Sequence, residues 1–569
     1  MTTNAGALST YLANVLKRTG LFTDEQLLAV MEEARKGDMG ITAIIIRDEY
    51  VKEEVFLTAL GAALNIPFVR LGKDPIPQDV LDRLPTKAVF QYNVIPVSFE
   101  NGVLNVASND PLNAGLLDAL RLAAGTRVRF VLSPSSEIEK AAKAFYGVGA
   151  ETVDRMMQDD RLEVEEEALG KVDLSDLDQE ASVVKFVNQI IWEAVQQGAT
   201  DIHFEPMENR LRIRYRVDGV LHQTPVPAQL NRFQAAILSR IKVMANMDIA
   251  EKRLPMDGRI GLRVQGEDID IRVSTVPTVY GESVSLRLLQ RRGQFIGLED
   301  LGMNEQDVKL TEKIINRPNG IVLVTGPTGS GKSTTLYAYL HEINTIDQRI
   351  LTAEEPIEYE MEGINQVLVR PEIGLTFARA LRSFLRQDPD IIMVGEVRDL
   401  ETAEIAIQAS LTGHLVFSTL HTNDAAGAFT RLLDMGVEPY LVASAVVAVV
   451  AQRLVRQLCP ACRQPIEPNI ALLQDIGFPI QHLASGRLYE QAGCELCRHT
   501  GFKGRKGIFE ILRVSEPTQS LVIRRSSSNE IKQQGISEGM RTLRDDGWMK
   551  VLLGVTTVEE VLRVSEENE

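Results

Sequence analysis

The feature that most constrains the fold is the segment GPTGSGKST at residues 326–334, which directly follows the apolar run 321–325. It fits the pattern G-x-x-x-x-G-K-[ST] and stands where that pattern requires, between an expected buried strand and an expected helix. The glycines let backbone N–H groups close around phosphates, and the helix points its N-terminal end at their charge. We expect Lys332 to reach the β- and γ-phosphates and Ser333 to bind Mg²⁺. The expected binding residues are Gly326, Pro327, Thr328, Gly329, Ser330, Gly331, Lys332, Ser333 and Thr334.

Two acidic segments follow this loop. Residues 390–396, DIIMVGE, read as a buried strand that ends in Glu396, which we expect to act through Mg²⁺-bound water rather than as a direct ligand. Residues 351–358, LTAEEPIE, place Glu354, Glu355 and Glu358 within five residues after another strand. In phosphoryl transfer one carboxylate must orient or deprotonate the attacking water. A solvated loop is the alternative for this cluster.

Two histidines flank the apolar strand expected at residues 415–420. His414 and His421 are seven residues apart, which at about 3.3 Å per residue is roughly 23 Å, too far for one metal ion. We expect separate polar contacts, one of which senses the γ-phosphate; the alternative is a structural hydrogen bond for each. Strands and helices alternate after about residue 300, which predicts a parallel α/β core.

Charge is uneven along the chain. The formal net charge is −17, and residues 151–180 carry twelve acidic against three basic residues, a balance of 3 − 12 = −9 that indicates a solvated linker. With aromatic residues at only 5 %, we expect no nucleic-acid partner. Residues 1–18 lack the pattern of a signal peptide, and the longest apolar run, 441–451, is shorter than the roughly 20 residues that span a bilayer. We expect a cytoplasmic protein that reaches a membrane only through partners.

The four cysteines form two C-x₂-C pairs separated by a 31-residue spacer. Four thiolates give Zn²⁺ a closed tetrahedral shell, so the site would be structural. A redox pair is the alternative, but such centres are usually single. The expected zinc ligands are Cys459, Cys462, Cys494 and Cys497.

Together these segments resemble the secretion ATPase superfamily of type II secretion and type IV pili. The glycine-rich loop, the acidic segment TAEEPIE, the segment LRQDPDIIMVGEVRD and the histidine segment TGHLVFSTLHTND match in order and spacing. Upstream, ATDIHFEP followed by RIRYRVDGVL resembles the second N-terminal domain of that family. The segments QASLTGH and TRLLDMGVEP resemble the type II E subunit more than the pilus extension ATPase.

The resemblance implies a homohexamer that hydrolyses ATP with Mg²⁺ at sites between subunits or domains. It implies that Arg259, Arg272 and Arg287 complete the site, that Glu358 is catalytic beside Glu396 and Lys332, and that His414 and His421 belong to the site. Glu354 and Glu355 would belong to the ATP site, with Glu355 in place of the usual Asp. It also implies partners in an inner-membrane platform protein and a membrane-anchored docking protein.

The first 150 residues contain two similar stretches, from Leu12 and from Thr42, an offset of 30 that indicates a weak duplication or two ordinary helical hairpins. They resemble the first N-terminal, MshEN-like domain of the family, whose repeats bind cyclic di-GMP in some members through Arg-Leu-Gly. The equivalent positions read Tyr11-Leu12-Ala13 and Ile41-Thr42-Ala43. We therefore expect a docking domain that does not bind cyclic di-GMP in that way.

The expected architecture is α/β, with a RecA-like P-loop core. We assign residues 1–150 to the first N-terminal domain, 151–180 to the acidic linker and 181–300 to a second, PAS-like α+β domain. Residues 301–569 form the ATPase domain, with the zinc insert at 455–510. The expected function is ATP-driven assembly of a pseudopilus in type II secretion. Type IV pilus extension, and a nucleotide-gated scaffold with little hydrolysis, are the alternatives.

Overall fold

The computed structural model describes residues 12–34, 40–48, 50–72, 75–113, 115–150, 152–153, 172–173, 182–264, 267–290, 297–485 and 487–565. Contacts divide the chain into two units, Met1–Leu288 and Leu289–Glu569. Nearly all of the expected acidic linker lies outside the described residues. Within the described residues, no helix is both long and apolar enough to cross a membrane.

The first unit begins with two pairs of helices that share one apolar core. The pairs are residues 12–18 with α2 (Asp24–Ala34), and α3 (Ile41–Arg47) with α4 (Glu53–Leu64). They coincide with the two similar stretches of the sequence. A three-stranded sheet follows in the order β1-β2-β3, with β2 antiparallel to β1 and parallel to β3. Its elements are α5 (Gln78–Leu81), α6 (Thr86–Tyr92), β1 (Val94–Glu100), β2 (Val103–Ser108), α7 (Leu116–Ala124), β3 (Arg127–Leu132) and α8 (Ser135–Tyr146).

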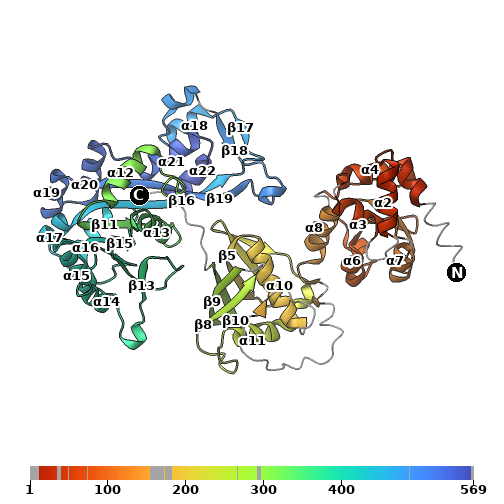
Figure 1. The fold of residues 1–569 in the computed structure, drawn as a ribbon, viewed down its shortest axis with the longest axis horizontal. Helices are drawn as coiled ribbons and strands as arrows, with labels where there is room; N and C mark the ends of the chain where they lie inside the picture. The colour runs from red at the N-terminus through yellow and green to blue at the C-terminus, as the bar shows by residue number, and fades with distance from the viewer. Residues whose placement is uncertain are drawn as a thin grey trace. The chain divides into compact units, whose positions relative to one another are not determined.

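The rest of the first unit is a seven-stranded sheet in the order β4-β8-β9-β10-β5-β6-β7. The segment LRIRYRV at residues 211–217 alternates apolar and basic residues, which predicts a strand with one wet face, and it is present as β6. Asp218 and Gly219 predict a hairpin turn, and they join β6 to β7. One face of the sheet packs against α10 and α11 in a continuous apolar core (Figure 1). The elements are β4 (Val172–Asp173), α10 (Ser182–Gln196), β5 (Ala199–Pro206), β6 (Leu211–Val217), β7 (Val220–Thr224), η1 (Ala228–Phe233), α11 (Gln234–Met244), β8 (Met256–Val264), β9 (Glu267–Thr278) and β10 (Gly281–Gln290).

The second unit is built on a seven-stranded sheet in the order β13-β12-β14-β15-β11-β16-β19. All neighbours are parallel except β16 and β19, which pair antiparallel. Strands β11 and β15 are buried along their whole length, as expected for a parallel sheet covered on both faces. The elements are α12 (Glu305–Ile315), β11 (Gly320–Thr325), α13 (Lys332–Ile343), β12 (Ile350–Glu354), β13 (Ile364–Leu368), η2 (Pro371–Ile373), α14 (Phe377–Phe384), β14 (Ile391–Val394), α15 (Leu400–Leu411), β15 (Leu415–Leu420), α16 (Gly427–Asp434), α17 (Pro439–Ala445), β16 (Val446–Leu458) and β19 (Phe502–Arg513).

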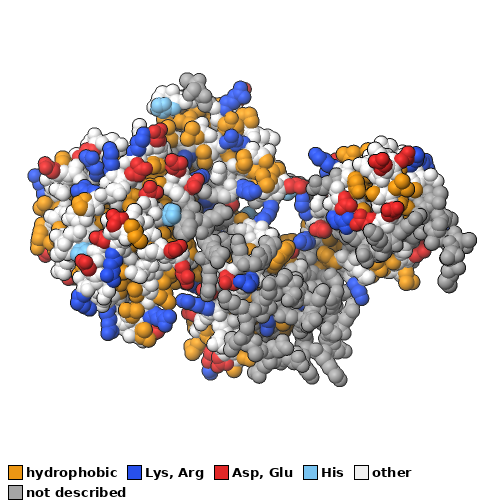
Figure 2. Space-filling model, viewed as in Figure 1, with side chains coloured by type: hydrophobic (Ala, Val, Ile, Leu, Met, Phe, Trp, Pro, Cys, Tyr) orange, Lys and Arg blue, Asp and Glu red, His pale blue; other side chains and the backbone are white. Residues whose placement is uncertain are grey.

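A small insert and a group of C-terminal helices complete this unit. The insert lies between β16 and β19, and the last helix, α22, contacts β16. On the face seen in Figure 2, acidic and basic side chains of the second unit are interspersed. The elements are β17 (Gln464–Ile466), α18 (Ile470–Asp475), η3 (Ile480–Ser485), β18 (Leu488–Glu490), η4 (Glu495–Cys497), α19 (Glu516–Ile523), α20 (Ser528–Ser537), α21 (Leu543–Leu552) and α22 (Val558–Ser565).

Candidate active site

The glycine-rich loop connects the carboxyl end of β11 to the start of α13. Gly331, which precedes α13, has φ +91°, and a Cβ there would lie 2.8 Å from Nε2 of Gln452. A Cβ on Gly326 would lie 2.6 Å from the carbonyl oxygen of Gln452. Both positions therefore require glycine for the loop to pass this close to β16. Ser333 is exposed in the first turn of α13, so its hydroxyl is accessible to Mg²⁺.

Lys332 folds back over the loop. Its Nζ donates hydrogen bonds to the carbonyl oxygens of Gly326, at 2.8 Å, and Pro327, at 3.1 Å. Burial lowers the pKa of Lys332 to about 8; the carboxylate of Glu396 opposes that shift and Arg453 adds to it. The half-buried ammonium therefore lies at the loop, near enough to Glu396 to feel its charge. A phosphate bound in the loop would offer it an anionic partner.

Arg398 joins the two acidic segments. Its guanidinium forms an ion pair with Glu396 and lies 3.6 Å from Oε2 of Glu355. Nε2 of His421 is 3.4 Å from the other carboxylate oxygen of Glu396. The structure thus gathers Glu355, Glu396 and His421, from three different loops, at one edge of the sheet. These loops follow β12, β14 and β15, which are parallel neighbours, so their carboxyl ends meet there.

The two histidines lie at opposite ends of β15. Nδ1 of His414 is 2.8 Å from the carbonyl oxygen of Ala409 in the last turn of α15, which gives His414 a structural hydrogen bond. His421 stands at the carboxyl end, beside Glu396. Next to it, the N–H of Thr422 donates to the hydroxyl of Thr325, the residue before the glycine-rich loop, at 2.9 Å. Only His421 of the pair is thus near the phosphate loop; a γ-phosphate contact for it stays a prediction.

Glu354 and Glu358 have different surroundings. Glu354 is the last residue of β12 and is 3 % exposed. Its carboxylate accepts hydrogen bonds from the hydroxyls of Tyr337 and Thr352 and from Nε2 of Gln366. Burial raises its pKa, and these donors oppose the shift. Glu354 therefore lies beneath the acidic loop, whereas Glu358 is half-buried within it and its N–H donates to the hydroxyl of Tyr337 at 3.1 Å.

The three arginines of the first unit stand on neighbouring strands. Arg259 of β8 is directly opposite Arg272 of β9 in the antiparallel register. Arg287 of β10 donates through Nε to Oδ1 of Asp201 at 3.0 Å. Along each strand the flanking aliphatic residues are buried, so the three arginines lie on the sheet face away from the apolar core. Their contribution to an ATP site stays a prediction.

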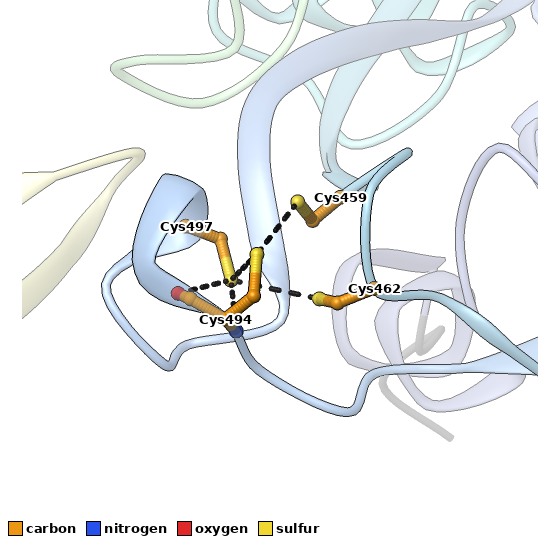
Figure 3. Close-up of side chains that lie close together, drawn as sticks. All are labelled: Cys459, Cys462, Cys494 and Cys497. Carbon is orange, nitrogen blue, oxygen red and sulfur yellow. Dashed lines mark hydrogen bonds between the residues drawn. The ribbon is translucent and has the colours of Figure 1, made fainter. Parts of the chain in front are cut away.

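The four cysteines lie together at the base of the insert (Figure 3). All four sulfur atoms are within 4.8 Å of one another. The Sγ–Sγ separations are 3.7 Å for Cys459–Cys494, 3.7 Å for Cys462–Cys497 and 3.8 Å for Cys494–Cys497. Corners of a tetrahedron with zinc–sulfur bonds of about 2.3 Å are about 3.8 Å apart, so the cluster fits Zn²⁺.

Backbone N–H groups favour the thiolate of Cys497, whereas burial and the neighbouring thiols raise the pKa of Cys462 to about 12. The N–H groups of Cys494 and Gly501 donate to Sγ of Cys497 at 3.1 and 3.2 Å. Burial opposes ionisation of Cys497, but these bonds lower its pKa to about 6. The cluster can therefore hold a metal ion, and the structure does not identify which one.

In the first unit, the positions equivalent to Arg-Leu-Gly carry no exposed phosphate ligands among the described residues. Ile41 is buried in the helical core, and the hydroxyl of Thr42 donates to Oδ1 of Asp110 at 2.8 Å. Tyr11 lies outside the described residues. The expectation about cyclic di-GMP stays a prediction.

The sequence analysis missed four residues of this site: Arg398, Tyr337, Gln366 and Arg453. Arg398 stands two residues after Glu396, and this short separation in the sequence could have indicated an ion pair between them. Tyr337 is almost fully buried in α13, and a buried tyrosine hydroxyl needs a polar partner. Arg453 donates to the carbonyl oxygens of Gln452 and Asn423 beside the loop. Its role and that of Gln366 depend on strand order, which the sequence does not display.

Comparison with known proteins identifies the family. The model of the family described as "Type II/IV secretion system protein" matches residues 176–563, and the MshEN domain model matches residues 64–152. The chain is 40 % identical to the type IV pilus assembly ATPase PilB of Myxococcus xanthus, over 98 % of this chain and 99 % of that protein. It is 43 % identical to the type II secretion system protein E of Xanthomonas campestris, over 97 % and 96 % of the two chains.

A third relative, the type II secretion system protein E of Pseudomonas aeruginosa, is 52 % identical over 69 % of this chain and 78 % of its own. The family match covers six of the seven strands of the larger sheet of the first unit, β5 to β10, and the whole phosphate-loop sheet of the second. The fold is the expected mixed α/β architecture with a RecA-like core, and the matched region contains the phosphate loop and the two acidic segments. The chain therefore belongs to the type II/IV secretion system protein family and is one of its ATPases.

Proposed function

We propose that this ATPase couples ATP hydrolysis to assembly of a pseudopilus through an inner-membrane platform, in type II protein secretion. The observation that carries the hydrolytic part is the meeting of Lys332, Glu396, Glu355 and His421 beside one phosphate loop. Lys332 is within reach of bound phosphates, and the carboxylates supply groups that can orient water. The closer likeness of QASLTGH and TRLLDMGVEP to the type II subunit supports secretion.

In this proposal each residue has a distinct task. The loop N–H groups and Lys332 bind the β- and γ-phosphates, while Ser333 holds Mg²⁺, which neutralises phosphate charge when bound. Glu358 orients and deprotonates the attacking water, because it lies in the acidic loop that is hydrogen-bonded to α13. Glu396, paired with Arg398 and near His421, is held at the same edge.

We further propose that the active form is a homohexamer in which arginines complete each site. Arg259 and Arg272 face away from their own apolar core, so their guanidinium groups are directed toward a surface. An arginine supplied to a transferred phosphoryl group raises rates by about 10³–10⁵ in related systems. Arg287, already paired with Asp201, would have to exchange that partner for a phosphate.

The experiment that tests hydrolysis measures steady-state ATP turnover with Mg²⁺, with molar mass measured by light scattering. The variants are Glu358→Gln and Arg272→Ala, and Arg263→Ala on the same face of β8 is the matched control. Turnover by a hexamer that is lost in Glu358→Gln and Arg272→Ala but kept in Arg263→Ala supports the proposal. ATP binding without turnover in every assembly state supports the gated scaffold instead.

Type IV pilus extension is the second candidate, because the PilB relative matches nearly the whole chain. Deletion of the gene separates the two. Loss of secreted proteins with pili retained supports secretion, and loss of surface pili with normal secretion supports extension.

We place the protein in the cytoplasm, at the inner membrane through its partners, with residues 1–150 as the docking domain for a membrane-anchored protein. Purified cytoplasmic fragments of platform and docking proteins, mixed with the full chain, test these contacts. Calorimetric titration with cyclic di-GMP should show no binding, since Ile41 is in the core; saturable binding would contradict this expectation.

A further inference from the structure

Glu354 is the centre of a buried hydrogen-bond network beneath the acidic loop. Thr352 donates to its Oε1 at 2.5 Å, Gln366 donates to the same oxygen at 3.1 Å, and Tyr337 donates to Oε2. Each of these three donors is a neutral side chain. Tyr337 belongs to α13, and Gln366 belongs to β13, the edge strand that pairs with β12. The network therefore connects helix α13 to the neighbouring strands β12 and β13.

Two of these donors also hold the backbone of the acidic loop. The hydroxyl of Tyr337 accepts the N–H of Glu358 at 3.1 Å, and its ring packs edge-on against Tyr359 with centroids 4.4 Å apart. Nε2 of Gln366 donates to the carbonyl oxygen of Tyr359 at 3.1 Å, and its Oε1 accepts the N–H of Met361 at 2.8 Å. Three backbone groups around Glu358 are thus fixed to side chains that are themselves bound to Glu354.

We propose that Tyr337 and Gln366 are positioning residues that set the place of Glu358 relative to bound ATP. Tyr337 is five residues after Lys332 on one helix, so a single hydroxyl links the phosphate-binding helix to the loop that carries Glu358. Catalysis depends on such placement, because displacement of a reacting group by about 1 Å can cost about 10²-fold in rate. The inference rests on the proposed function, in which Glu358 acts on the attacking water.

The test removes one hydroxyl at a time from α13. Tyr337→Phe keeps the ring and loses both hydrogen bonds, and we expect kcat to fall about tenfold while KM and ATP affinity stay within about twofold. Tyr339→Phe is the matched control, since Tyr339 is equally buried on the same helix but its hydroxyl faces Thr311. It should keep the wild-type kcat. An unchanged kcat in Tyr337→Phe, or an equal loss in Tyr339→Phe, would overturn the inference.

A double mutant separates positioning from a general loss of structure. If Tyr337 acts through Glu358, then Tyr337→Phe should not lower the residual turnover of Glu358→Gln any further, because residues that act together are not additive. Gln366→Ala, which releases the other side of the loop, should show the same kcat loss with unchanged ATP affinity. An additive loss in the double mutant would overturn the inference. Full turnover in Glu358→Gln alone would instead overturn the proposed function.

Discussion

The charge of Lys332 depends on pH near neutrality, because burial lowers its pKa to about 8. Only the protonated side chain attracts phosphates, so nucleotide binding should favour it and raise its pKa. Between pH 7 and pH 9 the charged fraction in the free protein falls by about tenfold. We expect the affinity for Mg²⁺-ATP to weaken by about tenfold over this interval, measured with a fluorescent ATP analogue. Constant affinity from pH 7 to pH 9 would contradict the prediction.

At the residue scale, sequence reasoning worked where a motif carries its own geometry. The phosphate loop is contiguous, and the cysteine spacing is enough to predict a four-thiolate cluster. Glu354 shows where such reasoning stops. The sequence placed three carboxylates together after a strand, but the first of them, Glu354, is the buried last residue of that strand. Its partners Tyr337 and Gln366 are brought to it by packing, 17 and 12 residues away along the chain.

At the scale of elements, the junction between the glycine-rich loop and α13 requires a residue in the left-handed backbone conformation. Gly331→Ala places a side chain at φ +91°, with Gln452 Nε2 2.8 Å away. We expect a loss of about 1–2 kcal/mol in stability and at least a tenfold loss of ATP affinity, measured by thermal unfolding and nucleotide binding.

Gly413→Ala is the control for Gly331→Ala. Gly413 has φ +109° but open space around its Cβ, and it precedes β15 at the edge of the sheet opposite the phosphate loop. The Gly413→Ala variant should lower the stability of the fold, while its affinity for ATP stays within about twofold of the wild type. Equal losses of affinity in both variants would show that backbone strain alone, rather than loop geometry, controls binding.

Glu560 attaches the last helix to the central sheet. Burial opposes its ionisation, but hydrogen bonds from Arg563 and Arg456 lower its pKa from 4.5 to about 2. A lowered pKa in the folded state stabilises the fold above pH 4.5, and this contribution is lost as the pH falls toward 2. We expect Glu560→Gln to lower the free energy of unfolding of the C-terminal unit by about 2 kcal/mol at pH 7, in urea unfolding followed by tryptophan fluorescence.

The exposed neighbour Glu559 provides the matched control, since Glu559→Gln removes the same charge from the same helix. It should change stability little. The difference in the free energy of unfolding between the two variants should become smaller as the pH is lowered from 4.5 to 3. A difference that stays constant would contradict the view that ionised Glu560 stabilises the fold.

Elements with strong periodicity were predicted well. The apolar stripe from Val183 to Val195 predicts an amphipathic helix, which is present as α10, and the strand 211–217 ends at the predicted turn. The histidine segment was harder, because the two edges of a parallel sheet look alike in sequence. Only the parallel pairing of β15 with β11 reveals that His421 and the phosphate loop share one edge and that His414 is at the other.

At the scale of the whole molecule, the cysteine cluster is expected to hold one zinc ion per chain. Metal analysis of the purified protein should give about one equivalent, and Cys494→Ser should lose it, because a closed site needs all four thiolates. The insert should then loosen and thermal stability should fall, while ATP still binds. Wild-type stability in a zinc-free protein would show that the cluster is not a structural metal site.

Strands β16 and β19 remain paired as far as Leu458 and Phe502, and the four cysteines stand just beyond this paired end. The two ends of the segment between the cysteine pairs therefore lie side by side, at the cysteine cluster. Gln452, which touches the phosphate loop, is seven residues before Cys459, or about 23 Å along the strand. A short fluorescent tag inserted after the exposed His482 would therefore be held at a fixed position away from the bound nucleotide. Its signal would report the movement of this ATPase in a living cell.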